Sequence, residues 1–84
     1  MIKFSERALI ALEKAPQPLK SKLTRIIHQL ERGHPLSSTI FHRKMRFREN
    51  VWIVRAESKV LYYSKEDDQI IILDILDPTE YRHD

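Results

Sequence analysis

Residues 51–76, with the sequence VWIVRAESKVLYYSKEDDQIIILDIL, decide the fold of this chain. Three apolar runs lie within them, at residues 51–56, 60–63 and 69–76. The runs are rich in β-branched and aromatic side chains, which are typical of strands, and short polar segments separate them. We therefore expect an antiparallel sheet with tight turns. The third run is apolar at almost every position, which predicts a central strand that is covered on both faces.

Two helices are predicted upstream of this sheet. Ser5 is placed to cap the first helix, and Pro16 follows its end. The second helix carries one apolar stripe at the 3.6-residue period. The stripe consists of Leu19, Leu23, Ile26, Ile27 and Leu30. Gly33, the only glycine, suits the left-handed residue that ends a helix. We expect an antiparallel two-helix hairpin packed on the sheet, which is an α+β fold, while residues 2–4 form either a short edge strand or a disordered start.

The composition limits the class of protein. With 84 residues the chain fits one domain, which we assign to residues 1–84. It has no cysteine, which excludes disulfides and cysteine-type zinc sites. The four histidines lack a metal-ligand spacing and one glycine cannot build a phosphate-binding loop, so we expect no metal and no cofactor. No apolar run approaches the roughly 20 residues of a membrane span, so we expect a soluble cytoplasmic protein.

The positive charge is unevenly distributed. Residues 1–63 hold 13 of the 15 Lys and Arg residues but 5 of the 12 Asp and Glu residues. The most basic segment is residues 42–48, HRKMRFR, which has no acid. Its four permanent cations could each contact a phosphate, and Phe47 or the later Trp52 could stack on a base. The alternative is a solvated edge strand whose charges prevent aggregation.

Arg55 lies inside an apolar strand run, between Val54 and Ala56. A guanidinium in such a place must reach water, an acid or a ligand. Two interpretations remain open at this point. The side chain either forms a structural pair with one of three downstream acids, or it is directed at a phosphate. The candidate acids are Glu57, Asp74 and Asp77.

Near the carboxyl end of the sequence, Tyr81, Arg82 and His83 place a phenol, a guanidinium and an imidazole together. A histidine can act as general acid or base near neutral pH, and an arginine can stabilise the charge on a crowded phosphate. The alternative is a frayed, solvated tail without a chemical role. The sequence by itself leaves both interpretations open.

The order of two helices and three antiparallel strands resembles the RelE/ParE superfamily of toxin–antitoxin toxins. Residues 50–56, NVWIVRA, and 59–62, KVLY, look like the family pattern of a strand with a basic residue, a short turn and a second strand opened by a basic residue. Residues 70–75 resemble the next strand of the family, and residues 30–35 resemble its passage from helix to loop. The resemblance covers nearly the whole chain and implies a RelE/ParE-like fold.

Family membership would imply one of two activities. RelE-like members cleave mRNA, commonly on the ribosome and without a metal, whereas ParE-like members inhibit DNA gyrase. Members of both kinds are neutralised by an antitoxin wrapped around them. The sequence departs from the pattern because the connection between Arg55 and Lys59 is short, and because Lys59 stands where arginine is more usual. Lysine cannot form a bidentate phosphate clamp.

The resemblance leads to the prediction of a metal-independent mRNA endoribonuclease toxin that acts on the ribosome. Its partners would be the cognate antitoxin, mRNA and the ribosome. The implied catalytic residues are Arg55, Tyr81, Arg82 and His83. The implied RNA-binding residues are His42, Arg43, Lys44, Arg46, Arg48 and Lys59. The alternatives are a ParE-like gyrase inhibitor without enzymatic activity and a basic nucleic-acid-binding module.

Overall fold

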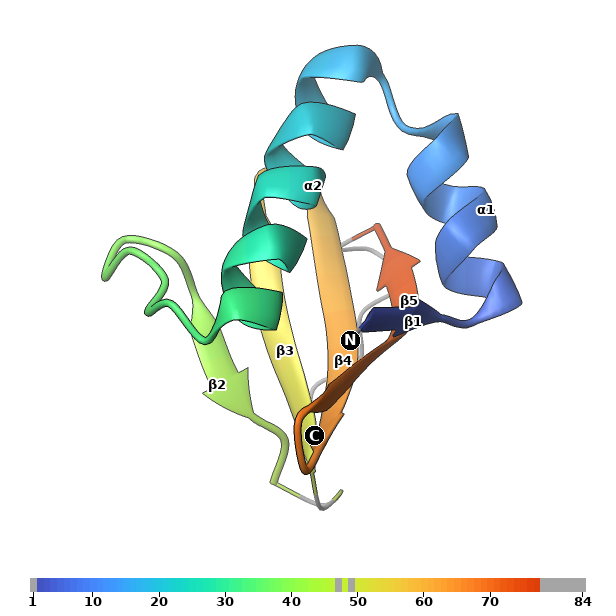
Figure 1. The fold of residues 1–84 in the computed structure, drawn as a ribbon. Helices are drawn as coiled ribbons and strands as arrows, with labels where there is room; N and C mark the ends of the chain where they lie inside the picture. Colours follow the sequence, from blue (N-terminus) through green and yellow to red (C-terminus); the bar gives the residue numbers. More distant parts are fainter. Residues whose placement is uncertain (1, 47, 49, 78–84) are drawn as a thin grey trace.

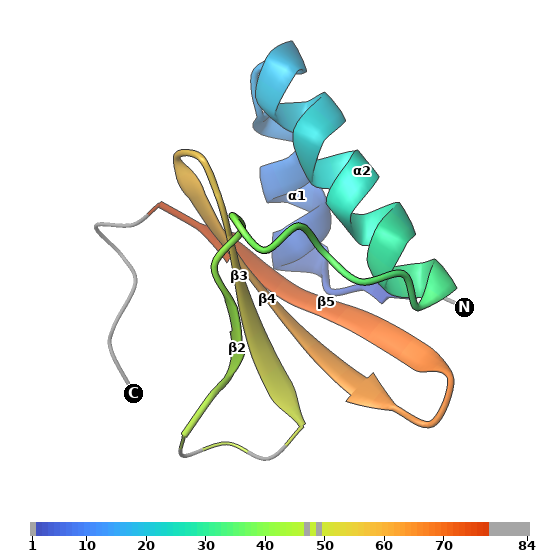
Figure 2. The same ribbon diagram turned by 90° about the vertical axis from the view of Figure 1, so that its left-hand side faces the viewer.

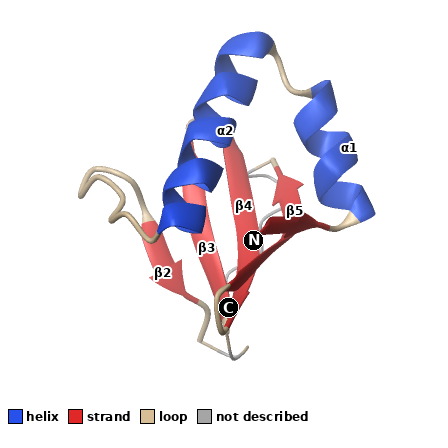
Figure 3. Cartoon of the chain, viewed as in Figure 1, coloured by secondary structure: helices blue, strands red, loops and turns tan. Residues whose placement is uncertain are grey.

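The computed structural model describes residues 2–46, 48 and 50–77. In chain order the elements are β1 (Ile2–Phe4), α1 (Glu6–Lys14), α2 (Gln17–Arg32), β2 (His42–Lys44), β3 (Val51–Ala56), β4 (Lys59–Glu66) and β5 (Gln69–Leu76). Both helices lie on one side of the sheet, and the chain runs up α1 and back down α2 (Figures 1 and 3). The predicted α+β class, the helical hairpin and the sheet are thereby confirmed.

The five strands form one sheet in the order β1-β5-β4-β3-β2. The pairs from β3 to β5 are antiparallel, as the sequence predicted. β2 also pairs with β3 in the antiparallel direction, whereas β1 at the edge pairs with β5 in the parallel direction. Residues 2–4 are therefore an edge strand, and the sheet is mixed. A parallel pair needs a long crossover, which the helices and the intervening strands supply.

Local signals in the sequence explain where the helices begin and end. The Ser5 hydroxyl accepts a hydrogen bond from the Ala8 amide and so caps α1, while it donates to the Leu73 carbonyl of β5. At the other end of the hairpin, Gly33 ends α2 in the left-handed conformation, with φ of 72°. Its amide donates to carbonyls of the last turn of α2, which satisfies groups that the helix leaves open.

Figure 2 shows the two helices over one face of the sheet, and the hydrophobic core lies between these layers. The stripe on α2 supplies Leu19, Leu23, Ile26 and Ile27, all of which are buried. β5 supplies Ile70, Ile72 and Ile75. Strict alternation of side chains would place Ile75 on the face opposite to Ile70 and Ile72. However, Tyr62 pairs with Asp74 while Tyr63 pairs with Ile72, so Leu73 is an extra residue in β5. This β-bulge restores the apolar residues to the helix side.

β5 lies between β1 and β4, so the prediction of a central strand is confirmed. Its two faces are not equally covered. Ile70, Ile72 and Ile75 are buried under the helices, whereas Ile71 and Leu73 are half-buried. No helix in the described part of the chain is long and apolar enough to cross a membrane.

Candidate nucleic-acid interface

The alternation of side chains along β3 separates the core from a second face of the sheet. Val54 and Ala56 point toward the helices and belong to the core cluster. The residues between them therefore point to the opposite face. On that face Ile53 is 1% exposed, whereas Arg55 is exposed. The strand thus carries one guanidinium outward from a well-packed apolar setting.

Phe41 is the neighbour of Arg55 on the β2 side of the sheet, as Val60 is on the β4 side. The Arg55 amide donates a hydrogen bond to the Phe41 carbonyl at 2.9 Å, which extends the β2–β3 ladder by one position. Phe41 is 48% exposed, and the guanidinium carbon of Arg43 lies 5.8 Å from the centroid of its ring. Because Phe41 and Arg43 are two positions apart on an extended segment, they share the face of Arg55. We call these three residues the Arg55 face.

The three acids considered as structural partners for Arg55 each bind another cation. Asp77 lies 2.6 Å from Lys59, Glu57 lies 3.3 Å from Lys22, and Asp74 lies 3.6 Å from Arg7. Within residues 2–46, 48 and 50–77, no ion pair or side-chain hydrogen bond involves Arg55. The guanidinium therefore faces solvent, where it can bind an anion.

The basic run of residues 42–48 does not form one surface. Arg43 lies on the Arg55 face, whereas His42 and Lys44 alternate onto the helix side of the sheet edge. Arg46 and Arg48 follow β2 in the connection to β3 and are exposed. β2 is thus an edge strand, and phosphate binding by the run stays a prediction.

Lys59 is also separated from Arg55. It pairs with Ala56 across the hairpin, which places it on the helix side, and its ammonium group binds Asp77. Phe47, Tyr81, Arg82 and His83 lie outside the described residues. Of the ten residues predicted from the sequence as site residues, the structure brings Arg43 and Arg55 together on one face.

His42 belongs to an aromatic cluster at the edge of the core. Its Nε2 lies 2.6 Å from the Tyr63 hydroxyl, and its ring centroid lies 5.2 Å from that of Trp52. Trp52 and Tyr63 stack with an interplanar angle of 13°. Partial burial lowers the pKa of His42, and burial raises the pKa of Tyr63 to about 12. His42 and Trp52 thus join β2, β3 and β4, and Trp52 packs against the core.

Phe41 is the site residue that the sequence analysis missed. The signal in the sequence is its position two residues before Arg43, which gives it the same side of an extended segment. Phe41 lies in the loop that leads into β2, and only its hydrogen bond to Arg55 shows that it joins the ladder. Within the described residues, no three His, Asp or Glu side chains gather as a metal site requires.

No protein-family model matches the sequence, and no curated protein matches it closely enough to count as a relative. Solved structures do match, and they define the fold as that of the RelE-type toxins. One is a chain of the RelB–RelE antitoxin–toxin complex from Methanococcus jannaschii, with a TM-score of 0.77 and 17% identity over 92% of this chain and 91% of that one.

Two structures from Escherichia coli are similar to the same degree. A chain of the DinJ–YafQ toxin–antitoxin complex has a TM-score of 0.79 and 15% identity, over 94% of this chain and 92% of that one. The isolated RelE toxin has a TM-score of 0.75 and 16% identity, over 92% of this chain and 82% of that one. The chain therefore has the RelE-like toxin fold over almost its full length.

Proposed function

We propose that this chain is the toxin of a toxin–antitoxin pair and a metal-independent endoribonuclease that cuts mRNA on the ribosome. The fold supports the class of protein, since the similar structures are toxins, two of them in complexes with an antitoxin. By the same likeness, a cognate antitoxin is the proposed protein partner. One observation carries the activity: Arg55 is exposed beside Phe41, and the three acids considered as its partners pair with other cations.

The Arg55 face has the groups that single-stranded RNA needs. An exposed phenyl ring can stack on a base regardless of its sequence, at about 1–3 kcal/mol per base. The guanidinium group of Arg55 can bind a phosphate oxygen pair in a bidentate manner, and Arg43 adds positive charge beside it. A base on Phe41 would therefore hold its adjacent phosphate beside Arg55.

The reaction requires no metal in principle. The 2′-hydroxyl loses its proton and attacks the adjacent phosphorus, the bond to the 5′ oxygen breaks, and that oxygen takes up a proton. Arg55, with Arg46 or Arg82, would stabilise the additional negative charge on the phosphate. His83 or Tyr81 would act as the base and acid, each role contributing about 10²–10⁴ in rate.

Induced expression of the chain in bacterial cells tests the proposal. The 5′ ends of mRNA are mapped, and plasmid supercoiling is measured in the same cultures. New mRNA ends within reading frames with normal supercoiling support a ribosome-dependent nuclease. Relaxed plasmid with intact mRNA would instead identify a gyrase inhibitor, and the absence of both effects would argue against a toxin.

His83→Ala is the variant that tests the chemistry. It should remove most cleavage, by about 10²–10⁴, while RNA binding stays within a factor of three of wild type. Lys14→Ala, on the exposed end of α1, serves as the control. Unchanged cleavage in His83→Ala would remove that residue from the proposed site.

A further inference from the structure

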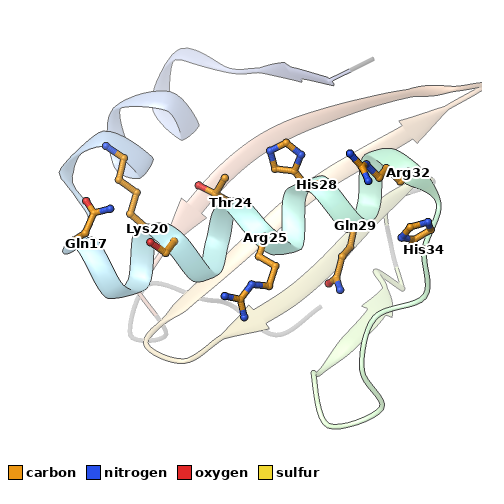
Figure 4. A pocket seen from close by; sticks show the side chains of 9 residues that line it. Gln17, Lys20, Thr24, Arg25, His28, Gln29, Arg32 and His34 are labelled. Atoms are coloured by element: carbon orange, nitrogen blue, oxygen red, sulfur yellow. The ribbon is translucent and has the colours of Figure 1, made fainter.

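The outer face of α2 carries a second basic surface, on the side of the helix that points away from the sheet. Nine residues line a shallow open pocket there: Gln17, Lys20, Ser21, Thr24, Arg25, His28, Gln29, Arg32 and His34. Figure 4 shows these side chains along the whole length of the helix, with the strands behind it. We call this surface the α2 polar face.

This face is opposite in position to the apolar stripe of the same helix. The stripe residues Leu23 and Ile26 are buried against the core, so the α2 polar face looks outward. The helices cover one face of the sheet (Figure 2), and Arg55 lies on the other face, because Val54 and Ala56 on either side of it belong to the core under the helices. The two basic surfaces are thus on opposite sides of the molecule and cannot both contact one flat segment of a partner.

The charge on the α2 polar face is not neutralised within the described part of the chain. Lys20, Arg25 and Arg32 form no ion pair there, and no carboxylate lines the pocket. Lys22 provides the contrast, because it turns toward the β3–β4 hairpin and binds Glu57 at 3.3 Å. Three cations left unpaired along one helix face indicate an anionic partner.

The remaining lining groups favour a phosphate backbone over a protein. Hot spots in protein interfaces are enriched in Trp, Tyr and Arg and lie in well-packed, desolvated pockets; this open face has two arginines but no aromatic or apolar residue to anchor a partner. Hydroxyl, amide and cationic side chains are the groups that contact phosphates and sugars. From Lys20 to Arg32 the helix rises about 18 Å, which equals about five phosphates of one duplex strand.

We propose that the α2 polar face docks the phosphate backbone of a folded RNA, while the Arg55 face receives the strand to be cut. The inference rests on the proposed function, because it names the RNA surface that would hold the toxin in place. A folded RNA can reach both sides of the molecule, which a short single strand cannot. Binding at the α2 polar face is independent of any cleavage step.

The test uses an RNA hairpin made entirely of 2′-O-methyl nucleotides, which lacks the attacking 2′-hydroxyl and cannot be cut. Its affinity for the whole chain is measured by fluorescence anisotropy between 50 and 200 mM salt, a range over which about three phosphate contacts change the affinity markedly. The variant Lys20→Gln/Arg25→Gln/Arg32→Gln should bind at least about tenfold more weakly. Its slope of log affinity against log salt should be shallower by about 2–3.

A control variant removes the same charge elsewhere. Lys14→Gln/Lys22→Gln/Lys65→Gln replaces three cations outside the α2 polar face. It should stay within a factor of three of wild type, and equal losses in the two triple variants would overturn the proposal. If the triple variant does not fold, the three single substitutions are measured instead. Each should make the slope of log affinity against log salt shallower by about 1.

Poly-glutamate distinguishes RNA from an acidic protein surface. If the α2 variant loses affinity for poly-glutamate but keeps its affinity for the hairpin, the proposal is wrong and the face binds protein. Because the hairpin cannot be cleaved, a failure of nuclease activity in cells does not affect this measurement. Loss of hairpin binding in the α2 variant with normal mRNA cleavage in cells would overturn the proposal, because the toxin would then cut its RNA without this surface.

Discussion

The backbone amide of Arg55 donates to the carbonyl of Phe41 at 2.9 Å, which fixes an exposed guanidinium beside an exposed aromatic ring. The pairing comes from the antiparallel ladder of β2 and β3, so both side chains leave the sheet on the same face. Arg43 completes the group by lying over the ring. Substitutions of Arg55 and Phe41 should therefore affect RNA cleavage and RNA binding without disturbing the core.

Arg55→Ala should reduce mRNA cleavage by about 10²–10³, the loss typical of removing one group that stabilises charge in a transition state. Arg55 is exposed, so the free energy of unfolding should change by no more than about 0.5 kcal/mol. Single-turnover cleavage and urea unfolding measure the two effects. Arg55→Lys keeps the charge but loses the bidentate geometry, so its cleavage rate should lie between those of wild type and Arg55→Ala. Full activity in Arg55→Ala would exclude the residue from catalysis.

Phe41→Ala should weaken the binding of a single-stranded RNA by roughly 5- to 150-fold, because one base loses a stacking interaction of about 1–3 kcal/mol. Leu9→Ala is the matched control, since Leu9 on α1 is 44% exposed and Phe41 is 48% exposed. Anisotropy titrations with an uncleavable oligonucleotide provide the measurement. Phe41→Trp should bind at least as tightly as wild type. A similar loss of affinity in Leu9→Ala would indicate a nonspecific effect.

His42 should make the fold less stable as the pH falls. Burial lowers its pKa from 6.5, so the unfolded chain takes up a proton more readily than the folded chain. The stability from this difference is complete above about pH 6.5 and is lost as the pH falls toward the lowered pKa. Tyr63, with its pKa raised to about 12, stays protonated throughout this range. Thermal unfolding between about pH 5 and 7 should therefore show a smaller slope in His42→Asn than in wild type.

The matched control for that measurement is His28→Asn, on the exposed side of α2. It should change the slope less than His42→Asn does. Equal slopes in wild type and His42→Asn would mean that the contact with Tyr63 does not couple to protonation.

Gly33→Ala should destabilise the fold by about 1 kcal/mol, because φ of 72° is unfavourable for a residue with a Cβ atom. No atom lies within 4 Å of the position that the Cβ would occupy, so the cost is one of backbone conformation alone. Gly33→Asn should cost less, since asparagine tolerates the left-handed region better. Urea unfolding measures both, and an unchanged midpoint in Gly33→Ala would contradict this assignment of the helix end.

Several elements could be predicted from the sequence because their signals are local. The stripe on α2, the Ser5 cap and the Gly33 end all depend on residues within a few positions of each other. The strand at residues 51–56 was also predicted with its observed bounds. β4 extends further than expected, to Glu66, because polar side chains do not prevent the backbone from pairing with β5. The turn is accordingly confined to Asp67 and Asp68.

The candidate site could not be predicted in the same way. The basic run at residues 42–48 is continuous in sequence, but the two-residue period of β2 sends Arg43 to one face and His42 to the other. The likeness to known structures at 15–17% identity shows the fold and leaves the activity as a proposal.

The sequence by itself determined the helical hairpin, the strands from 51 to 76 and the presence of a basic surface, since each follows from local periodicity and composition. Only the tertiary structure decided which of those charges act together. Ladder register placed Arg55 opposite Phe41, and ion pairs of Glu57, Asp74 and Asp77 with other cations left its guanidinium without an acidic partner among the described residues. Register and ion pairing join residues far apart in the chain, and no local pattern specifies them.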